Sequence, residues 1–321
     1  MESIDGGCRV KSAEFQLESE QTIKDLFKKL SCESENNKND DEEYLLKIDT
    51  KNMKVQILSN KDKDSNNKDK TIEHSYFSNM KNTVSDNNNY TNEKKILNFN
   101  KTDKILLFSP HPDDEILGAC ALLHNCFSNN IDIKVIYMTS GKTAGDVNIR
   151  KNEAINGIKV IGGKEENLNF IVMPFYERED RVVDEDDYEF IRKIIKENNP
   201  NYVFICADIY DPKRTHEKCF DILIKVLNGN IYNHMEGINL FFYYSVWYNP
   251  KENEYTHIMP YNYDVYKLKV YAMLEHQSQI KTNFMGDDTR PFYLRAITRD
   301  ENYGKINNEE YCEIYYKIEN N

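Results

Sequence analysis

The pattern of apolar and polar residues changes near residue 100 of the 321-residue chain. Before that point Asn, Lys, Asp, Glu and Ser dominate the sequence. Such a composition buries too little apolar surface to offset the entropy of ordering the chain. We therefore predict that residues 1–100 are a low-complexity, mostly disordered extension. Within it, the partly alternating segments 44–48 and 53–58 predict a β-hairpin, and residues 18–30 predict a short helix.

From residue 101 onward, short apolar runs alternate with segments that carry apolar residues at helical spacing. These patterns predict strands at 105–108, 133–138, 169–172, 202–206 and 240–246, and helices at 115–127, 146–161, 184–198, 215–227 and 265–281. Several of the strands are apolar on both faces, which is typical of a parallel sheet covered by helices on both sides. Residues 101–321 are therefore predicted to form an α/β domain, a Rossmann-like three-layer sandwich with a mostly parallel sheet. Such sheets place their ligand sites beyond the carboxyl ends of the strands.

Composition limits the partners and the compartment. The net charge of −12 argues against the basic face that nucleic-acid binding needs. The seven cysteines lack the spacing of a disulfide framework or a zinc knuckle, which favours a reducing compartment. The first 16 residues lack the apolar region of a signal peptide, and the most apolar segment, 238–248, is too short to span a bilayer. We expect a cytoplasmic protein with no nucleic-acid partner and no membrane span, and the sequence leaves its oligomeric state open.

Ionisable residues are concentrated directly after the first predicted strand, in the turn His111-Pro112-Asp113-Asp114-Glu115. The proline fixes the backbone between the imidazole and the acids. A histidine and a carboxylate three positions apart can then reach one ion and leave the adjacent carboxylate free. The alternative interpretation is that an aspartate of this turn only caps the following helix.

A second polar segment, residues 208–216, follows the fourth predicted strand and ends at His216. Because it also lies at a strand carboxyl end, His216 is expected to meet His111 and Asp114 across the crevice. Two histidines and one carboxylate with an open position suit a catalytic zinc ion. The same donors bind Fe²⁺, so the ligand set leaves the metal open between Zn²⁺ and Fe²⁺.

These motifs resemble those of the PIG-L/LmbE-like zinc-dependent N-deacetylases, in the family's order. The resemblance covers about residues 103–300 and includes the turn at 111–115, the Asp-Pro-x-x-Thr-His segment and the late run 269–279. The segments Phe175-Tyr176, 211–216 and 285–292 resemble more narrowly the deacetylase-type module of glucosamine-6-phosphate deaminase-like proteins.

The resemblance implies a zinc-dependent hydrolase that removes an N-acyl group, such as acetyl, from a small amino sugar. An N-acetylglucosamine derivative, with or without a phosphate, is the implied substrate. Carried over position by position, the resemblance implies that His111, Asp114 and His216 bind the metal and that Asp113 is the general base. Such a base takes a proton from water and later returns it to the departing amine.

One position departs from the family pattern. Many relatives have a second histidine three positions before the metal-binding histidine, where it stabilises the oxyanion, and here that position is Lys213. Lys213, with Arg214 beside it, supplies positive charge but cannot shuttle a proton at neutral pH as histidine does. The alternative function is therefore a weak or silent module that binds metal and sugar and has a regulatory role.

Five further residues are candidates for the site. Arg150 is placed to hold a sugar hydroxyl or a phosphate, and the alternative is an ion pair with Glu153 on the same helix. His276 matches the family's His-x-Ser-Gln motif and is assigned either to the crevice, as a catalytic residue, or to helix capping and packing. Arg290, with the nearby arginines 295 and 299, is a candidate for an anionic substrate group, and surface ion pairs are the alternative.

Overall fold

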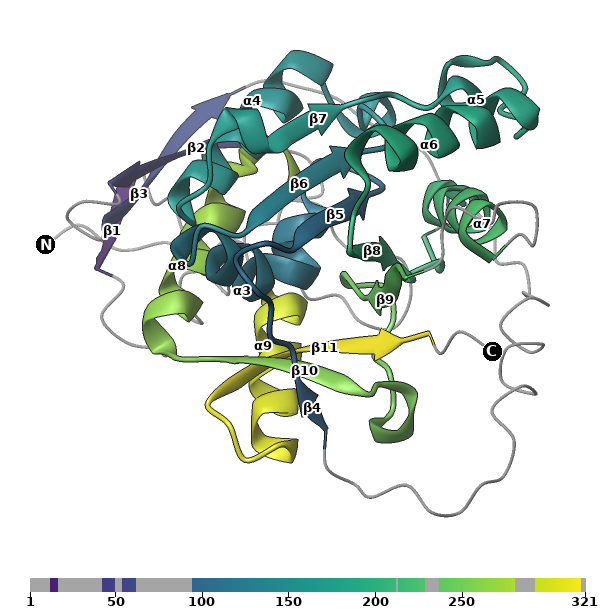
Figure 1. Cartoon of the computed structure of the whole chain (residues 1–321). Helices are drawn as coiled ribbons and strands as arrows, with labels where there is room; N and C mark the ends of the chain where they lie inside the picture. Colours follow the sequence, from purple (N-terminus) through teal and green to yellow (C-terminus); the bar gives the residue numbers. More distant parts are fainter. Residues whose placement is uncertain are drawn as a thin grey trace, which may run out of the picture.

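The computed structural model describes residues 12–16, 42–49, 54–61, 94–211, 213–228, 237–280 and 292–318. Its main feature is an eight-stranded sheet with the strand order β4-β10-β11-β9-β8-β5-β6-β7 (Figure 1). The strands are β4 (Lys95–Ile96), β5 (Lys104–Ser109), β6 (Asp132–Tyr137), β7 (Leu168–Phe170), β8 (Tyr202–Cys206), β9 (Asn239–Tyr243), β10 (His257–Tyr261) and β11 (Tyr311–Lys317). The five strands from β9 to β7 are parallel, with Leu107 of β5 opposite Val135 of β6 and Phe204 of β8.

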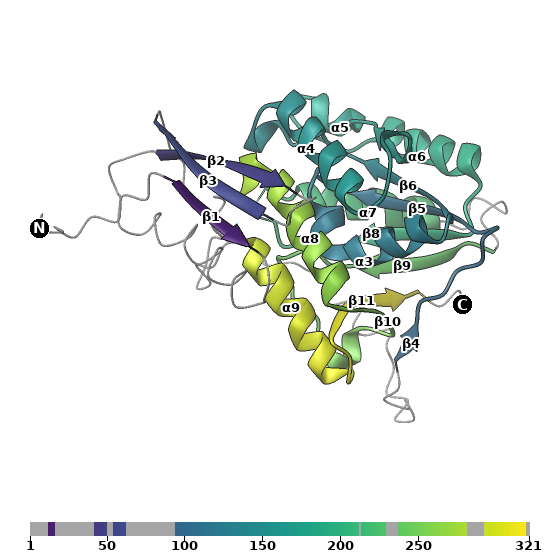
Figure 2. The ribbon, with the colours of Figure 1, turned by 90° about the vertical axis from the view of Figure 1, so that its left-hand side faces the viewer.

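Helices cover both faces of this sheet, so the predicted three-layer sandwich is confirmed (Figures 1 and 2). One apolar core lies between the sheet and the helices α3 (Asp114–Ser128), α4 (Val147–Val160), α8 (Tyr263–Glu275) and α9 (Phe292–Ile306). The other core lies beneath α5 (Pro174–Glu177), α6 (Glu185–Asn198) and α7 (Thr215–Asn228). Short 3₁₀ turns are formed by η1 (Lys142–Ala144), η2 (Glu165–Asn167), η3 (Glu252–Glu254) and η4 (Gln277–Gln279).

Each strand and helix expected between residues 105 and 281 is present, and all but β8 have shifted ends. The largest shift is at α8, which ends at Glu275 instead of 281, because His276 leaves the helical conformation and the turn η4 follows. The sequence pattern did not predict β10, α9 or β11. Strands β11 and β10 add an antiparallel edge next to β9, and β4 then pairs in parallel with β10, so the sheet begins before residue 101.

Three strands near the amino terminus form a separate antiparallel sheet in the order β1-β3-β2. They are β1 (Ser12–Gln16), β2 (Glu42–Asp49) and β3 (Lys54–Lys61), and β2 lies beside α8 (Figure 2). The pairing of β2 with β3 is the predicted hairpin. The helix predicted at 18–30 lies outside the described residues, and the disorder of the remaining extension stays a prediction.

Helix α3 is kinked at Ala119, where the backbone leaves the helical region. Glu313 of β11 accepts hydrogen bonds from the N–H groups at positions 121 and 122, at 2.9 and 3.2 Å. Arg299 of α9 donates to the carbonyl of Leu117 at 2.9 Å. Arg299 is therefore buried in the fold and paired with Asp300 at 3.1 Å, so its ion pair is not on the surface, and an anion-binding role for it stays a prediction.

No helix in the described part of the chain is long and apolar enough to cross a membrane.

Candidate active site

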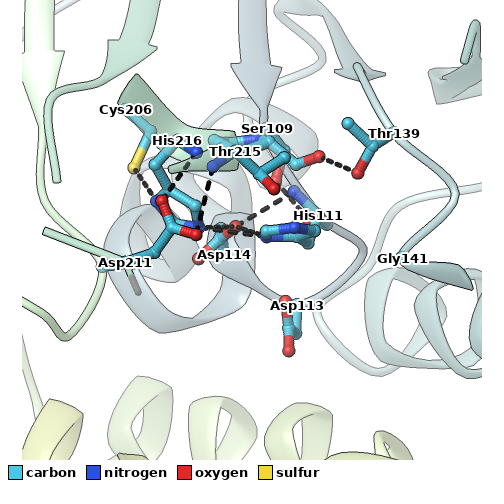
Figure 3. Close-up of polar contacts among 12 residues, drawn as sticks. Ser109, His111, Asp113, Asp114, Thr139, Gly141, Cys206, Asp211, Thr215 and His216 are labelled. Atoms are coloured by element: carbon cyan, nitrogen blue, oxygen red, sulfur yellow. Dashed lines mark hydrogen bonds and ion pairs between the residues drawn. The ribbon is translucent and has the colours of Figure 1, made fainter. Parts of the chain in front are cut away.

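His111, Asp114 and His216 meet beyond the carboxyl ends of β5 and β8, and Figure 3 shows them pointing toward one another. Nδ1 of His111 lies 3.0 Å from Nε2 of His216. Oδ2 of Asp114 lies 3.4 Å from the first of these nitrogens and 3.2 Å from the second. The strands bring together residues that are 105 positions apart in sequence, as the sequence analysis expected.

The three donor atoms fit a divalent cation. A tetrahedral ion bound at the usual zinc–ligand distances has neighbouring donor atoms about 3.3 Å apart, and the observed separations are 3.0, 3.2 and 3.4 Å. Asp114 and His216 are buried and His111 is partly exposed, so the cluster opens to solvent on the His111 side. Two imidazoles and one carboxylate leave room for a further ligand, as catalytic metal sites require.

The pKa values of the cluster are strongly coupled. Although burial disfavours its charged form, the Asp114 carboxylate raises the pKa of His216 well above its usual value. Burial lowers the pKa of His111. Against the effect of burial, the two imidazoles hold the pKa of Asp114 well below its usual range. A bound cation would also lower the pKa of Asp114, and it would favour the neutral form of both imidazoles.

The turn that carries His111 and Asp114 is held by a buried hydrogen-bond network. Glu115 accepts hydrogen bonds from Tyr137 at 2.7 Å, from Ser109 at 3.2 Å and from the backbone N–H of Asp113 at 3.1 Å. Burial raises the pKa of Glu115 to about 7. Of the four ionisable side chains in this turn, Glu115 therefore has a structural role that the sequence analysis did not identify.

Asp113 occupies the N-cap position of α3, but its side chain makes no capping hydrogen bond. Its backbone is in an unusual conformation with φ of 149°. Figure 3 shows its carboxylate beside the metal-binding cluster and pointing away from it. Burial raises the pKa of Asp113 well above its usual value, against the opposing effect of Arg150. The interpretation of this aspartate as a simple helix cap is therefore not supported.

Arg150 of α4 is the partner of Asp113. Its Nη2 lies 3.2 Å from Oδ2 of Asp113 and donates to the carbonyl of Pro112 at 2.9 Å, while Nη1 donates to the carbonyl of Gly141 at 3.1 Å. The side chain is 2% exposed. Glu153, the ion-pair partner considered from the sequence, instead accepts two hydrogen bonds from Ser278.

The loop before α7 positions His216. Asp211 accepts hydrogen bonds from the N–H groups of Thr215 and His216, at 3.2 and 2.9 Å. The sequence analysis gave Asp211 no role, although an aspartate just before a helix is a recognisable capping pattern. Behind the ring, Sγ of Cys206 lies 3.8 Å from Nδ1 of His216. Asp211 thus fixes the backbone of His216 while Cys206 faces Nδ1 of its ring, and Nε2 is directed at the cluster.

Lys213 and Arg214 lie at the edge of the site and not in the cluster. Nζ of Lys213 donates to the carbonyl of Thr143 at 2.9 Å and so links the loop after β8 to the turn after β6. The guanidinium of Arg214 is exposed and paired with Glu217, at 2.8 Å through Nη2. Arg290 lies outside the described residues. The roles given to these three residues in catalysis or substrate binding stay predictions.

His276 is fully buried at the carboxyl end of α8. Its Nε2 faces Gly157 of α4, where an added Cβ would lie 3.1 Å away. Both ring nitrogens lack a hydrogen-bond partner among the residues described. Burial and the nearby Arg150 lower the pKa of His276 to about 3. The structure therefore favours the packing interpretation, and a catalytic role for His276 stays a prediction.

Comparison with known families agrees with the site geometry. Residues 106–227 match the PIG-L family, described as GlcNAc-PI de-N-acetylase. This range contains His111, Asp113, Asp114, Arg150 and His216. The chain therefore contains a PIG-L domain, and the resemblance stated from the sequence is confirmed.

Individual relatives are distant. A putative glucosamine-6-phosphate deaminase-like protein of Bacteroides thetaiotaomicron is 23% identical, over 61% of this chain and 39% of that protein. The chain thus spans about two fifths of the length of this curated relative.

Two solved structures share the fold. The N,N'-diacetylchitobiose deacetylase of Pyrococcus horikoshii is 18% identical with a TM-score of 0.54, and the match covers 68% of this chain and 87% of that one. The conserved protein TT1542 of Thermus thermophilus is 15% identical with a TM-score of 0.51, over 67% and 94%. At these identities the likeness establishes the fold.

Proposed function

We propose that this chain is a metal-dependent amide hydrolase that removes an acetyl or similar acyl group from the nitrogen of a small amino sugar. One observation carries the proposal: three side chains that could hold a metal ion meet where strands β5 and β8 end, and a fourth, arginine-paired carboxylate lies beside them. The PIG-L match and the deacetylase among the structural neighbours support the same reaction class. An N-acetylglucosamine derivative is the proposed substrate.

His111, Asp114 and His216 are the residues that would hold the metal, with zinc as the first candidate and Fe²⁺ as the alternative. When bound, the cation supplies polarisation of the amide carbonyl and activation of water at neutral pH. The reaction forms a C–O bond to the acyl carbon and breaks its C–N bond, which gives a carboxylate and a free amine.

Asp113 is the proposed general base. It takes the proton of the attacking water and delivers it to the leaving amine. Arg150 keeps this carboxylate in one orientation through the ion pair and two hydrogen bonds to backbone carbonyls. Lys213 is the proposed source of positive charge for the oxyanion, in place of the family's histidine.

A weak or silent module that binds metal and sugar is the second candidate. It is favoured by the position of Lys213, whose amine is exposed and already donates to Thr143. An oxyanion donor must be free to point at the developing charge. Loss of one such donor lowers the rate by about 100-fold or more.

The test uses the full chain. Bound metal is measured by elemental analysis, and amine release is assayed from N-acetylglucosamine and its 6-phosphate after loading with Zn²⁺ or, without oxygen, with Fe²⁺. Asp113→Asn is expected to keep the metal and lose hydrolysis, whereas His216→Ala is expected to lose both. One metal ion per chain together with amine release supports the hydrolase.

The other outcomes separate the two candidates. Bound metal with no amine release from either sugar favours the silent module, and Lys213→His is then expected to restore activity if the missing histidine is the cause. Absence of metal binding in the intact, folded chain would contradict both candidates.

A further inference from the structure

The segment after β6, residues 138–143, forms one side of the candidate active site. The N–H and the side-chain hydroxyl of Thr139 both donate to the carbonyl of Pro110, at 3.1 and 2.7 Å. Farther along, the carbonyl of Thr143 accepts the amine of Lys213. The segment therefore lies against the turn that carries His111 and Asp114, as Figure 3 shows for Thr139 and Gly141.

Ser140 lies in the middle of this segment with an unused hydroxyl. The residue is 8% exposed, and its Oγ has no hydrogen-bond partner in the described structure. A buried polar atom without a partner costs about 1–3 kcal/mol. Such atoms are uncommon in native proteins, and a ligand is one recognised reason for them.

Tyr176 of α5 has a second unused hydroxyl. The side chain is fully buried, and its OH also lacks a hydrogen-bond partner among the residues described. The N–H of Met173 donates to the carbonyl of Met138 at 2.7 Å, so α5 begins against the end of β6. Met138 and Tyr176 belong to the same apolar core, and Ser140 lies two residues after Met138.

Two cations flank the ring of Tyr176. The guanidinium of Arg181 lies 4.4 Å from the ring centroid, and Nζ of Lys142 lies 5.1 Å from it. Lys142 is paired with Glu177 at 2.8 Å. Arg181 has no carboxylate partner in the described ranges, so its charge is uncompensated.

Two other arginines near the candidate site are already paired. Arg150 is committed to Asp113, and Arg214 is paired with Glu217. Arg181, which lies over the ring of Tyr176 and has no carboxylate partner among the described residues, is therefore a candidate for an anionic group. Its guanidinium presents two parallel N–H groups, which suits the oxygens of a phosphate.

We propose that Ser140, Tyr176, Lys142 and Arg181 form a subsite beside the metal-binding cluster that binds the phosphate of a sugar phosphate. The two hydroxyls donate to phosphate oxygens and the two cations balance their charge. The inference rests on the proposed hydrolase function, because the phosphate would belong to the same substrate whose amide is hydrolysed.

The first experiment compares kcat/KM for N-acetylglucosamine 6-phosphate with kcat/KM for N-acetylglucosamine. In Arg181→Gln the ratio of the two values is expected to fall by about tenfold or more, since a charge-assisted hydrogen bond is lost. Arg192→Gln is the matched control, because Arg192 pairs with Glu185 and Glu189 of its own helix, α6. A ratio that stays the same in Arg181→Gln contradicts the subsite.

Tyr176→Phe separates binding from folding. The substitution removes a hydroxyl that has no partner in the fold, so the free energy of unfolding is expected not to fall. The ratio of kcat/KM values is nevertheless expected to drop. Reduced stability with an unchanged ratio would mean that the hydroxyl has a structural role only.

A binding measurement makes the two proposals distinguishable. Inorganic phosphate is titrated into the metal-free chain, and the rise in melting temperature is recorded for wild type and Arg181→Gln. Stabilisation that requires Arg181, without hydrolysis of either sugar, supports the subsite and contradicts the hydrolase. Hydrolysis of both sugars with no effect of Arg181 on either readout supports the hydrolase and overturns the subsite.

Discussion

Nη2 of Arg150 lies 3.2 Å from Oδ2 of Asp113, and both side chains are almost completely buried. An arginine in this position acts on the carboxylate that it touches, because its other hydrogen bonds go to backbone carbonyls. The residue is therefore a positioning residue for the proposed base, a role that the sequence did not indicate.

Replacement of Arg150 tests this relationship. In Arg150→Gln, Asp113 is left buried without a counter-charge, which is expected to lower the free energy of unfolding by about 3 kcal/mol. Misplacement of the base is expected to lower kcat by about 100-fold. Arg150→Lys keeps the charge and is expected to recover part of both losses. If only KM rises and stability is unchanged, Arg150 contacts the substrate instead.

The guanidinium of Arg150 occupies the space that a side chain at position 141 would need. Its φ is +67°, and an added Cβ would lie 2.2 Å from Nη1 of Arg150. Gly141→Ala is therefore expected to displace the guanidinium and to lower both the melting temperature and hydrolysis.

Gly237→Ala is the control for this substitution, since Gly237 has φ of +95° and nothing within 4 Å of its added Cβ. It is expected to cost only about 1–2 kcal/mol of backbone strain and to leave hydrolysis unchanged. Equal effects of the two substitutions on stability and hydrolysis would show that backbone strain, and not contact with Arg150, explains the loss.

Cys206 is expected to influence metal affinity. A metal-binding histidine is held by the partner of its other ring nitrogen, and for His216 that partner is the sulfur of Cys206 at 3.8 Å. Cys206→Ala is expected to raise the Kd for Zn²⁺ by about tenfold. Cys126 is also a buried cysteine but lies on α3. Cys126→Ala is therefore the control and should leave the Kd unchanged. The same Kd in Cys206→Ala and wild type would rule out the influence.

His276 makes stability depend on pH. Burial lowers its pKa from the usual 6.5 to about 3, so the folded chain keeps it neutral while the unfolded chain takes up a proton. The unfolded state then binds more protons between these two values, and stability falls as the pH falls below 6.5. The loss due to this residue is about 1.4 kcal/mol per pH unit.

Chemical denaturation of wild type and His276→Met at several pH values checks this expectation. The stability difference between the two proteins should shift in favour of the variant as the pH falls from 6.5 toward 3. A difference that does not change with pH would contradict the lowered pKa. Loss of hydrolysis in a folded variant would instead support the catalytic role predicted from the motif.

The sequence predicted the parallel part of the fold well, since β5 and β8 are short apolar runs bounded by polar turns. It did not predict β11, because buried Glu313 interrupts the apolar pattern of that strand. The carboxylate is tolerated there because Lys269 lies 2.8 Å away and two backbone N–H groups donate to it. A local pattern of apolar and polar residues cannot reveal such long-range partners.

The three candidate metal ligands could be predicted from their residue types and their positions at strand ends. A histidine and an acid at one strand end, with a histidine at another, are sufficient to place the candidate metal-binding cluster. The roles of Arg150 and Asp211 were not predictable in this way. Arg150 pairs with Asp113, 37 positions away, and the helical spacing to Glu153 suggested a local partner instead.

The kink of α3 has a consequence for the size of the folding unit. The family match ends at residue 227, yet the amides released at the kink are bound by Glu313, and the carbonyl of Leu117 is bound by Arg299. A chain truncated after residue 227 would expose these groups in the helix that carries Asp114. The turn that carries His111 and Asp114 is therefore linked to the last strand through buried hydrogen bonds, and excision of residues 106–227 alone is expected to leave the candidate metal site unformed.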